Sequence, residues 1–113
     1  MKVAIVGSRE FAHLGKVEKY IRTLPKDTII VSGGAIGVDK WAEQWARFLG
    51  LGTIILKPDW NKFGKAAGMI RNTQIVETCD RLVAFWDGKS KGTKDSIDKA
   101  TKLGKPVEVI NDR

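Results

Sequence analysis

Short apolar runs alternate along this chain with stretches in which apolar residues recur at helical spacing. The first apolar run, Lys2–Val6, ends at Gly7, a pattern typical of a buried strand followed by a sharp turn. In Leu14–Leu24 the apolar side chains recur every three or four residues until Pro25 ends the pattern. The chain is therefore predicted to begin with a strand and a helix.

The same alternation continues to the end of the chain. Further apolar or β-branched runs predict strands at Thr28–Val31, Thr53–Leu56, Arg81–Trp86 and Pro106–Ile110. Further stretches with helical spacing predict helices at Val38–Leu49, Ala66–Cys79 and Gly92–Leu103. The polar and aromatic segment Lys57–Gly64 has no such period and is expected to be a loop.

Five strands that alternate with four helices in 113 residues imply right-handed crossovers between parallel strands. We expect an α/β fold, a doubly wound parallel sheet of about five strands with helices on both faces. A chain of this length has room for one compact domain, residues 1–113. In such sheets ligands bind at the carboxyl ends of the strands, near the point where the strand order reverses.

Composition excludes several classes of protein. Hydrophobic residues make up 42% and charged residues 29%, a balance typical of folded chains. No apolar run approaches the roughly 20 residues of a membrane span, and no signal peptide precedes Gly7, so a cytoplasmic protein without membrane contact is expected. One cysteine and one histidine are too few for a structural zinc site, and no protein metal site is expected.

The chain carries 20 basic and 13 acidic side chains, a net charge of +7. Such an excess indicates an anionic partner, such as a nucleotide or a nucleic acid. The densest stretch is Asp87–Lys105, with six lysines and three aspartates. A solvated lysine face would give the same composition, so both interpretations stay open.

Three predicted strand ends carry glycines and small polar residues. These segments are Gly7-Ser8-Arg9, Ser32-Gly33-Gly34-Ala35-Ile36-Gly37 and Asp87-Gly88-Lys89-Ser90-Lys91-Gly92-Thr93. Glycines let a backbone approach a phosphate, and the amides and dipole of a following helix favour its negative charge. None of the segments is a GxGxxG or a Walker GxxxxGK[ST] motif. A single loop of this kind can be an ordinary tight turn, but three together favour a phosphate site.

Polar residues in these segments have both a functional and a structural interpretation. The Arg9 guanidinium matches the geometry of a phosphate, and the Ser8 and Ser32 hydroxyls either bind the same phosphate or cap turns. Ser90 and Thr93 bind phosphate at a helix N-terminus, or Ser90 is only the cap of that helix. Asp39, in the first turn of a predicted helix, either receives a ribose hydroxyl or offsets the helix dipole.

The aromatic residues divide into two groups. Trp41 and Trp45 share a helical stripe with apolar residues, which favours a place in the core or in an interface between chains. Trp60 lies in the predicted loop, where an indole can stack on a base. His13 is expected at the surface, and Cys79 is expected to be buried and inert.

The motifs along nearly the whole chain are spaced as in a known group of proteins. They are Val6–Arg9, Ser32–Ala42, Pro58–Trp60, Gly64, Ala67-Gly68, Arg71-Asn72 and Ser90–Thr93. This spacing resembles the SLOG superfamily of Rossmann-like proteins, in particular its small single-domain YspA-like members. The resemblance implies a Rossmann-like fold and a nucleotide-linked function.

Two branches of that superfamily share parts of the pattern. Ser32–Ala42 and the pair Arg71-Asn72 resemble DNA-processing protein A, a branch that binds single-stranded DNA. Met69–Thr93 resembles the LONELY GUY phosphoribohydrolases, which cleave nucleoside 5′-monophosphates to base and ribose 5-phosphate. In that branch an arginine precedes a Pro-Gly-Gly-x-Gly-Thr-x-x-Glu loop. The resemblance makes Arg71 the candidate catalytic residue, whereas alone the pair Arg71-Asn72 would indicate a solvated helix face.

The chain departs from the phosphoribohydrolase pattern at two places. Ser96 stands where that branch has its glutamate, and Asp87-Gly88-Lys89 replaces Pro-Gly-Gly. Glycosidic cleavage needs a carboxylate to stabilise an oxocarbenium ion or to activate water, which serine cannot do. Asp87 and Asp95 are near enough in sequence to be substitutes. N-glycosidic hydrolysis therefore stays an open hypothesis.

We expect the chain to bind a nucleotide or a nucleotide derivative, as a sensor or as a processing enzyme. The candidate ligand-binding residues are Gly7, Ser8, Arg9, Ser32, Gly33, Gly34, Gly37, Asp39, Trp60, Asn72, Asp87, Ser90, Gly92 and Thr93. Mg²⁺ could accompany a bound nucleotide, because it needs few protein ligands. The alternative is a single-stranded nucleic-acid binding module. Self-association is also expected, as a homodimer or a higher homo-oligomer, since members of the superfamily often form dimers.

Overall fold

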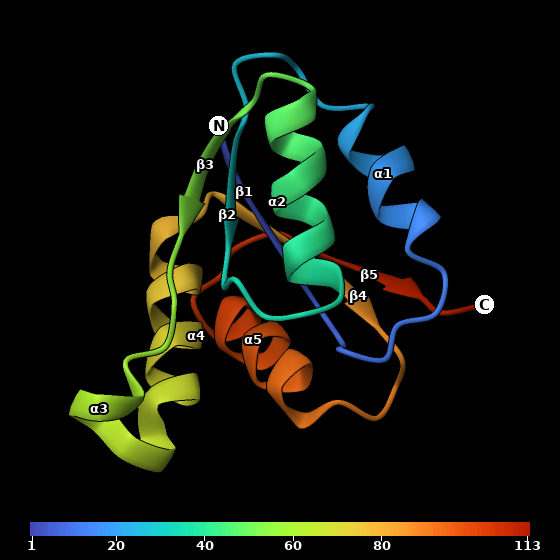
Figure 1. Ribbon diagram of the computed structural model, residues 1–113. Helices are drawn as coiled ribbons and strands as arrows, with labels where there is room; N and C mark the ends of the chain where they lie inside the picture. Colours follow the sequence, from blue (N-terminus) through green and yellow to red (C-terminus); the bar gives the residue numbers. More distant parts are fainter.

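A parallel β-sheet forms the centre of the protein, which a computed structural model describes over residues 1–113 (Figure 1). Its five strands lie in the order β3-β2-β1-β4-β5. Their bounds are β1 Lys2–Gly7, β2 Ile29–Ser32, β3 Gly52–Ile55, β4 Arg81–Trp86 and β5 Val107–Asn111. All four strand pairs are parallel, which confirms the predicted fold class.

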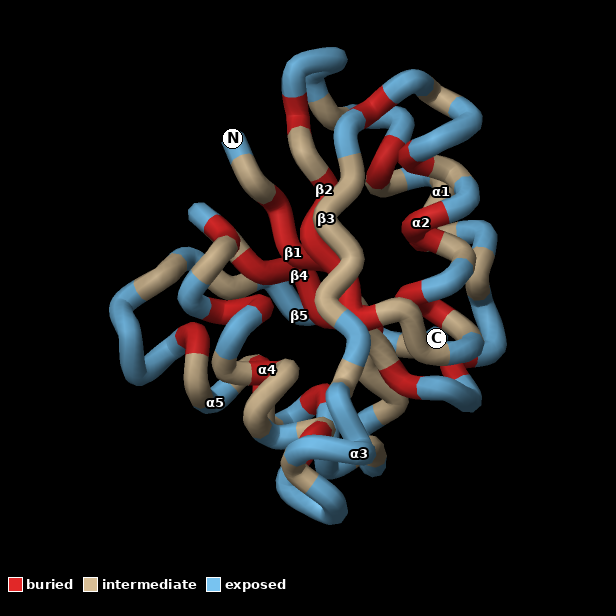
Figure 2. Tube along the Cα trace, turned by 60° about the vertical axis from the view of Figure 1, so that its left-hand side comes forward, coloured by how far each residue is buried: buried red, intermediate tan, exposed pale blue.

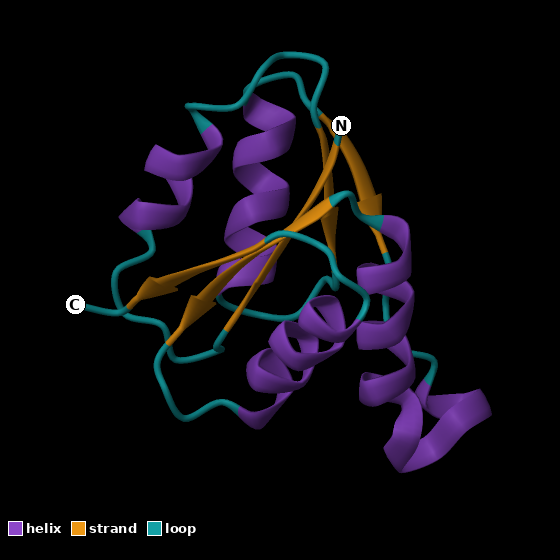
Figure 3. Cartoon of the chain, turned by 180° about the vertical axis from the view of Figure 1, so that it is seen from behind, coloured by secondary structure: helices purple, strands orange, loops and turns teal.

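Helices cover both faces of the sheet (Figure 3). The longer ones are α1 Gly15–Ile21, α2 Val38–Phe48, α4 Ala67–Thr78 and α5 Lys91–Lys102. Side chains of α1 and α2 pack in one apolar cluster with one face of the sheet. Side chains of α4 and α5 pack in a second cluster with the other face. The protein is therefore a three-layer, doubly wound α/β structure.

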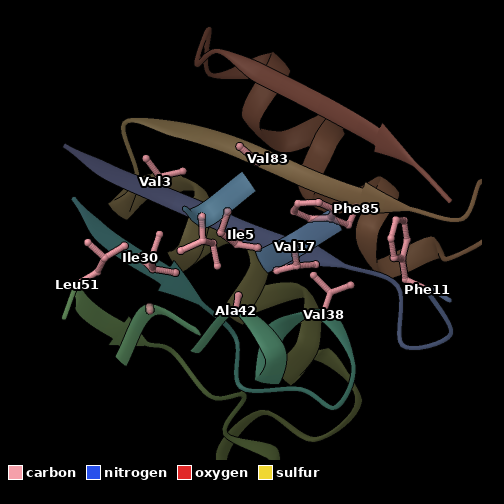
Figure 4. Close-up of a cluster of buried hydrophobic side chains, with 12 residues drawn as sticks. Val3, Ile5, Phe11, Val17, Ile30, Val38, Ala42, Leu51, Val83 and Phe85 are labelled. Atoms are coloured by element: carbon pink, nitrogen blue, oxygen red, sulfur yellow. The ribbon is translucent and has the colours of Figure 1, made fainter. Parts of the chain in front are cut away.

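The alternation of side chains along each strand explains the two clusters. In β1, Val3 and Ile5 belong to the first cluster, whereas Ala4 and Val6 belong to the second. In β4, Val83 and Phe85 likewise alternate with Leu82 and Ala84. Successive side chains of a strand point to opposite faces, so strands buried on both faces are apolar throughout. Figure 4 shows the first cluster, with side chains of β1, β2 and β4 above those of α2.

One predicted loop contains helical structure instead. Within Lys57–Gly64 the chain forms the short helix α3, Trp60–Phe63, followed by a single 3₁₀ turn, Gly64–Ala66. The Asp59 carboxylate caps α3 by accepting a hydrogen bond from the Lys62 amide at 3.1 Å. The segment is mostly exposed, as the pale blue tube around α3 shows (Figure 2). A four-residue helix with little buried surface leaves no periodic signal in a sequence, and the loop prediction was wrong for this reason.

The strand order places the topological switch point between β1 and β4. From β1 the chain passes outward to β2 and β3, then crosses to the other side of β1 to form β4 and β5. The helices that follow β1 and β4 therefore lie on opposite faces of the sheet, which leaves a crevice at the carboxyl ends of these two strands. None of the helices has the length and apolar character that a membrane crossing requires.

Candidate functional site

A cavity of about 530 Å³ lies at the carboxyl ends of β1 and β4. It receives residues from the loops after β1, β2 and β4, from α2, α4 and α5, and from α3 and the 3₁₀ turn after it. The residues that line it are Val6, Gly7, Ser8, Arg9, Glu10, Ala35, Asp39, Trp60, Lys65, Gly68, Met69, Arg71, Asn72, Ile75, Asp87, Lys89, Ser90, Gly92, Thr93 and Ser96. Most of these are polar or glycine, so the cavity suits a polar ligand.

The floor of the cavity is held by contacts between the β1 and β4 ends. The Ser8 amide donates to the Phe85 carbonyl at 3.0 Å, and the Asp87 amide donates to the Ser8 hydroxyl at 3.2 Å. Gly7 lets α2 approach closely, because a β-carbon there would lie 2.5 Å from atoms of Val38. Ser8 is buried and acts as a bridge between two loops, which fits the structural interpretation of its hydroxyl.

The loop after β4 is shaped by a carboxylate that accepts backbone hydrogen bonds. Oδ1 of Asp87 accepts from the amides of Lys89 at 2.8 Å and Ser90 at 2.9 Å. These two hydrogen bonds lower the pKa of Asp87, so the carboxyl is ionised at neutral pH. Ser90 then caps α5, its hydroxyl accepting from the Thr93 amide at 3.3 Å. The amino end of α5 faces the cavity through Gly92 and Thr93.

Arg71 is held in place by two direct partners, one of which is itself bound to α5. Its Nη1 donates to the Gly33 carbonyl at 2.7 Å, and its Nε donates to Oδ1 of Asn72 at 3.1 Å. The Asn72 amide in turn donates to the Gly92 carbonyl at 3.3 Å and to Oδ2 of Asp95 at 3.1 Å. This network joins the loop after β2, helix α4 and the start of α5. It presents a fixed positive charge at the cavity wall.

Asp39 supplies a buried negative charge to the same cavity. It is only 5% exposed, and burial raises its pKa to about 6, against the opposing effects of Arg71, the Ala35 and Gly33 amides, and Arg9. Burial also lowers the pKa of Arg71, and the neighbouring Asp39 counteracts that shift. A carboxyl with such a pKa changes its charge close to physiological pH, and shifted pKa values of this kind cluster at functional sites.

The structure brings most of the predicted site residues to the cavity. Those that line it are Gly7, Ser8, Arg9, Asp39, Trp60, Arg71, Asn72, Asp87, Ser90, Gly92 and Thr93. Four others, at the end of β2 and in the glycine segment that follows it, do not line it: Ser32, Gly33, Gly34 and Gly37. Their assignment to ligand binding stays a prediction, and the structure gives three of them a clear structural role.

These three glycines shape the segment that carries Asp39. A β-carbon on Gly33 would collide with the Arg71 guanidinium and would also crowd the Asp39 carboxylate. Gly34 and Gly37 have φ angles of +72° and +87°, which side chains with a β-carbon rarely adopt. Ser32 is fully buried, and its hydroxyl has no hydrogen-bond partner.

The aromatic and sulfur-containing residues lie as their patterns indicate. Trp60 is 56% exposed at the edge of the cavity, whereas Trp41 and Trp45 are partly buried against the first cluster. Cys79 is buried in the second cluster. His13 is at the surface, where its Nδ1 lies 2.6 Å from Oδ1 of Asp112. Sequence separation concealed this partner, because 99 positions separate the two residues.

Several cavity residues were not among the candidate ligand-binding residues, although the quoted segments and motifs include some of them. They are Val6, Glu10, Ala35, Lys65, Gly68, Met69, Ile75 and Lys89. Gly68 precedes Arg71 by three residues and Met69 precedes Asn72 by three, so each lies about one turn before a predicted site residue of α4. That spacing was the available signal for them. Lys65 lies in the 3₁₀ turn that follows α3, and its position could not be read from a pattern.

The candidate substitutes for the missing glutamate differ in their availability. Ser96 is buried and lines the cavity, with its hydroxyl donating to the Gly92 carbonyl at 3.4 Å. Asp95 does not line the cavity, and its carboxylate is bound by Asn72 and by Lys99 at 2.9 Å. The carboxylates that do line the cavity belong to Glu10, Asp39 and Asp87. Nowhere do three or more histidine, cysteine or acidic side chains gather as a metal site would require.

Comparison with known proteins relates the chain to one protein family. A sequence model of the family described as "YspA, cpYpsA-related SLOG family" matches residues 1–63. The Gene 61 protein of Mycobacterium phage D29 is 36% identical over 95 residues, which cover 79% of this chain and 76% of that protein. The match to the family covers more than half of the chain.

Two solved structures of DNA processing protein A share the fold. The protein from Streptococcus pneumoniae has 25% sequence identity and a TM-score of 0.84, with 96% of this chain aligned to 49% of that chain. The protein from Helicobacter pylori, described with a single-stranded DNA binding mode, has 26% identity and a TM-score of 0.74. There, 96% of this chain aligns to 64% of the other. The chain thus spans about half of the first structure and less than two thirds of the second.

Proposed function

The chain belongs to the YspA-related SLOG family, and we propose that it binds a nucleotide or a nucleotide derivative in the cavity between the β1 and β4 ends. The observation that carries this proposal is the convergence of phosphate-binding elements on one cavity. Arg9, Arg71 and the amino end of α5 all face it. We further propose that residues 1–113 act as a single nucleotide-binding domain.

The phosphate subsite is assigned to the side of the cavity formed by Arg9 and the start of α5. Gly92 has no β-carbon and so leaves the first amides of the helix accessible, and the helix dipole adds a positive potential there. Lys65 and Lys89 increase the positive charge at the same cavity. A guanidinium and backbone amides together match the charge and the hydrogen-bond geometry of a phosphate group. Mg²⁺ bound with the nucleotide stays a prediction.

The proposal covers binding and leaves hydrolysis as a hypothesis. Ser96 cannot supply the carboxylate that a phosphoribohydrolase requires, although Asp39 and Asp87 line the cavity. Arg71, the candidate catalytic residue by resemblance, is engaged with Gly33 and Asn72. Release of free base from a nucleoside monophosphate would establish the activity. A negative result with several bases would remove it without affecting the binding proposal.

Replacement of Arg9 tests the binding proposal. Arg9→Ala is expected to abolish nucleotide binding and to leave folding unchanged, because Arg9 is exposed at the cavity. A ligand at about 100 times its dissociation constant adds roughly 2.7 kcal/mol of stability, so the wild-type melting temperature should rise by several degrees. The measurement is a thermal-shift screen with nucleoside mono-, di- and triphosphates, NAD and ADP-ribose.

Lys26→Ala is the matched control for that screen. It also removes one positive charge, but Lys26 lies in the exposed turn between α1 and β2, at the opposite end of the sheet. This variant should keep the full ligand-induced shift. Loss of folding in Arg9→Ala would show that Arg9 is structural, and equal shifts in all three proteins would place the ligand elsewhere.

A second candidate function is the binding of single-stranded nucleic acid. It is favoured by the similarity to the Helicobacter pylori protein, by the net charge of +7 and by the exposed Trp60 at the cavity edge. A strand that contacts several cations loses affinity steeply with salt, with a slope of about −0.7 per neutralised phosphate. A mononucleotide held by few cations has a shallow slope. Titrations with an oligonucleotide and a mononucleotide at several salt concentrations separate the two functions.

A further inference from the structure

We propose that the Asp39 carboxylate receives the free 2′- and 3′-hydroxyl groups of a ribose, so that the cavity selects ribonucleotides whose diol is unesterified. The inference rests on the proposed function, because it identifies the ligand class of the same cavity. It depends on the unfilled hydrogen-bond acceptor sites of the buried Asp39 carboxylate and on the order of the groups along the cavity wall.

Asp39 has unused hydrogen-bonding capacity that faces the cavity. Asp39 is only 5% exposed, yet its carboxylate accepts only from backbone amides, from Ala35 at 3.4 Å and more weakly from Gly33. An ionised carboxylate offers about four acceptor sites, and buried polar groups in native proteins are normally satisfied. No side chain donates to it. A ligand in the cavity can supply these donors in place of water.

The group that meets Asp39 must be neutral and must donate hydrogen bonds. A phosphate carries negative charge and only acceptor oxygens, so the Asp39 carboxylate would repel it. A hydroxyl group avoids that repulsion and donates a proton to the carboxylate. Two neighbouring hydroxyls can engage both carboxylate oxygens. The vicinal diol of a ribose therefore fits the chemistry of Asp39.

The order of groups along the cavity wall also places a ribose at Asp39. Both Asp39 and the Arg71 guanidinium lie against Gly33. Gly68, one turn before Arg71 in α4, lies beside the Trp60 indole. Asn72, the residue after Arg71, contacts Gly92 of α5. A base against the indole and a phosphate at α5 would leave the sugar between them. This is the base–ribose–phosphate order of a nucleotide.

The contact between Asp39 and the ribose hydroxyls distinguishes a free mononucleotide from a nucleotide inside a nucleic-acid strand. Within a nucleic-acid chain the 3′-oxygen is esterified and cannot donate, and DNA also lacks the 2′-hydroxyl. Asp39 therefore favours a free mononucleotide, or a 5′-substituted derivative, over an internal nucleotide of a strand.

Calorimetric titration with paired nucleotides tests the inference. The probes are AMP, GMP, CMP and UMP, each compared with its 2′-deoxy counterpart. At least one ribonucleotide should bind wild-type protein, with the deoxy form about 10- to 100-fold weaker, since a hydrogen bond to a charged group is lost. Asp39→Asn should reduce this ratio toward one. Circular dichroism checks that the variant folds.

Glu43→Gln is the matched control. Glu43 is another buried carboxylate of α2, one turn after Asp39, but it does not line the cavity. This variant should keep the wild-type ratio of affinities. Equal binding of ribo and deoxy forms by wild-type protein would overturn the inference while leaving the proposed function intact. An unchanged ratio in folded Asp39→Asn would also overturn it. Failure of every nucleotide to bind at millimolar concentration would overturn both proposals.

Discussion

Single residues decide the chemistry of the cavity, and Asp39 and Gly33 are the clearest examples. Asp39 could be singled out from the sequence because it follows the glycine segment at the start of a predicted helix. Its burial and its pKa of about 6 could not, because they depend on packing. Gly33 receives the Arg71 side chain from 38 positions away. Sequence proximity carries no information on such a contact.

Replacement of Asp39 is expected to stabilise the unliganded protein at neutral and higher pH. The folded pKa, about 6, lies above the ordinary value of 3.8. The carboxyl therefore contributes stability below pH 3.8, and this contribution is lost as the pH rises through 6. At pH 8 Asp39→Asn should be more stable than wild type by about 2 to 3 kcal/mol, and near pH 4 the two should be similar. Urea unfolding at both pH values measures the difference.

This prediction separates a functional charge from a structural one. A carboxylate that serves the fold would cost stability when removed, because its partners would lose hydrogen bonds. A carboxylate held for a ligand costs the empty protein stability while it is buried and charged. A less stable Asp39→Asn variant at pH 8 would therefore contradict our description of the site.

Secondary-structure elements were the most predictable level of this protein. Strands and long helices have strong periods, and all five strands and four long helices occur within a few residues of their predicted bounds. Helix α1 ends at Ile21, earlier than predicted, and continues only as turns to Leu24. The short α3 and the 3₁₀ turn after it were missed, and with them the position of Lys65 at the cavity. Elements without a buried face leave little trace in the sequence.

Removal of the α5 cap should affect both stability and binding. Ser90→Ala deletes the hydroxyl that accepts from the Thr93 amide and from the Thr93 hydroxyl. Loss of an N-cap costs about 1 kcal/mol, which lowers the melting temperature by several degrees. Nucleotide affinity should also fall, since the loop from Asp87 to Thr93 forms part of the proposed phosphate subsite. Thermal unfolding and calorimetry measure the two effects.

Thr101→Ala is the control for the cap. It removes a hydroxyl from the last turn of the same helix, where Thr101 is exposed and donates only to the Ile97 carbonyl at 2.8 Å. Stability should change by less than about 0.5 kcal/mol, and nucleotide affinity should not change. Equal effects of the two substitutions would show that the cap has no special role.

At the scale of the whole molecule, the parallel sheet determines where a ligand site can form. The strand order β3-β2-β1-β4-β5 fixes the switch point, and the cavity lies there. The three glycine segments predicted this location, because each lies at the end of a predicted strand. Self-association through Trp41 and Trp45 stays a prediction. Both side chains pack partly against the first cluster, and the neighbouring Phe48 is 74% exposed.

The central claim is that a nucleotide occupies the cavity between the β1 and β4 ends, and amide chemical shifts test it most directly. The measurement is a titration of ¹⁵N-labelled protein with 5′-ribonucleoside monophosphates, followed by two-dimensional NMR. We expect the largest shifts at the amides of Gly7–Arg9 and of Asp87–Thr93, with smaller ones near Asp39. Shifts confined to the outer faces of α1 and α2, or no shifts at millimolar nucleotide, would contradict the claim.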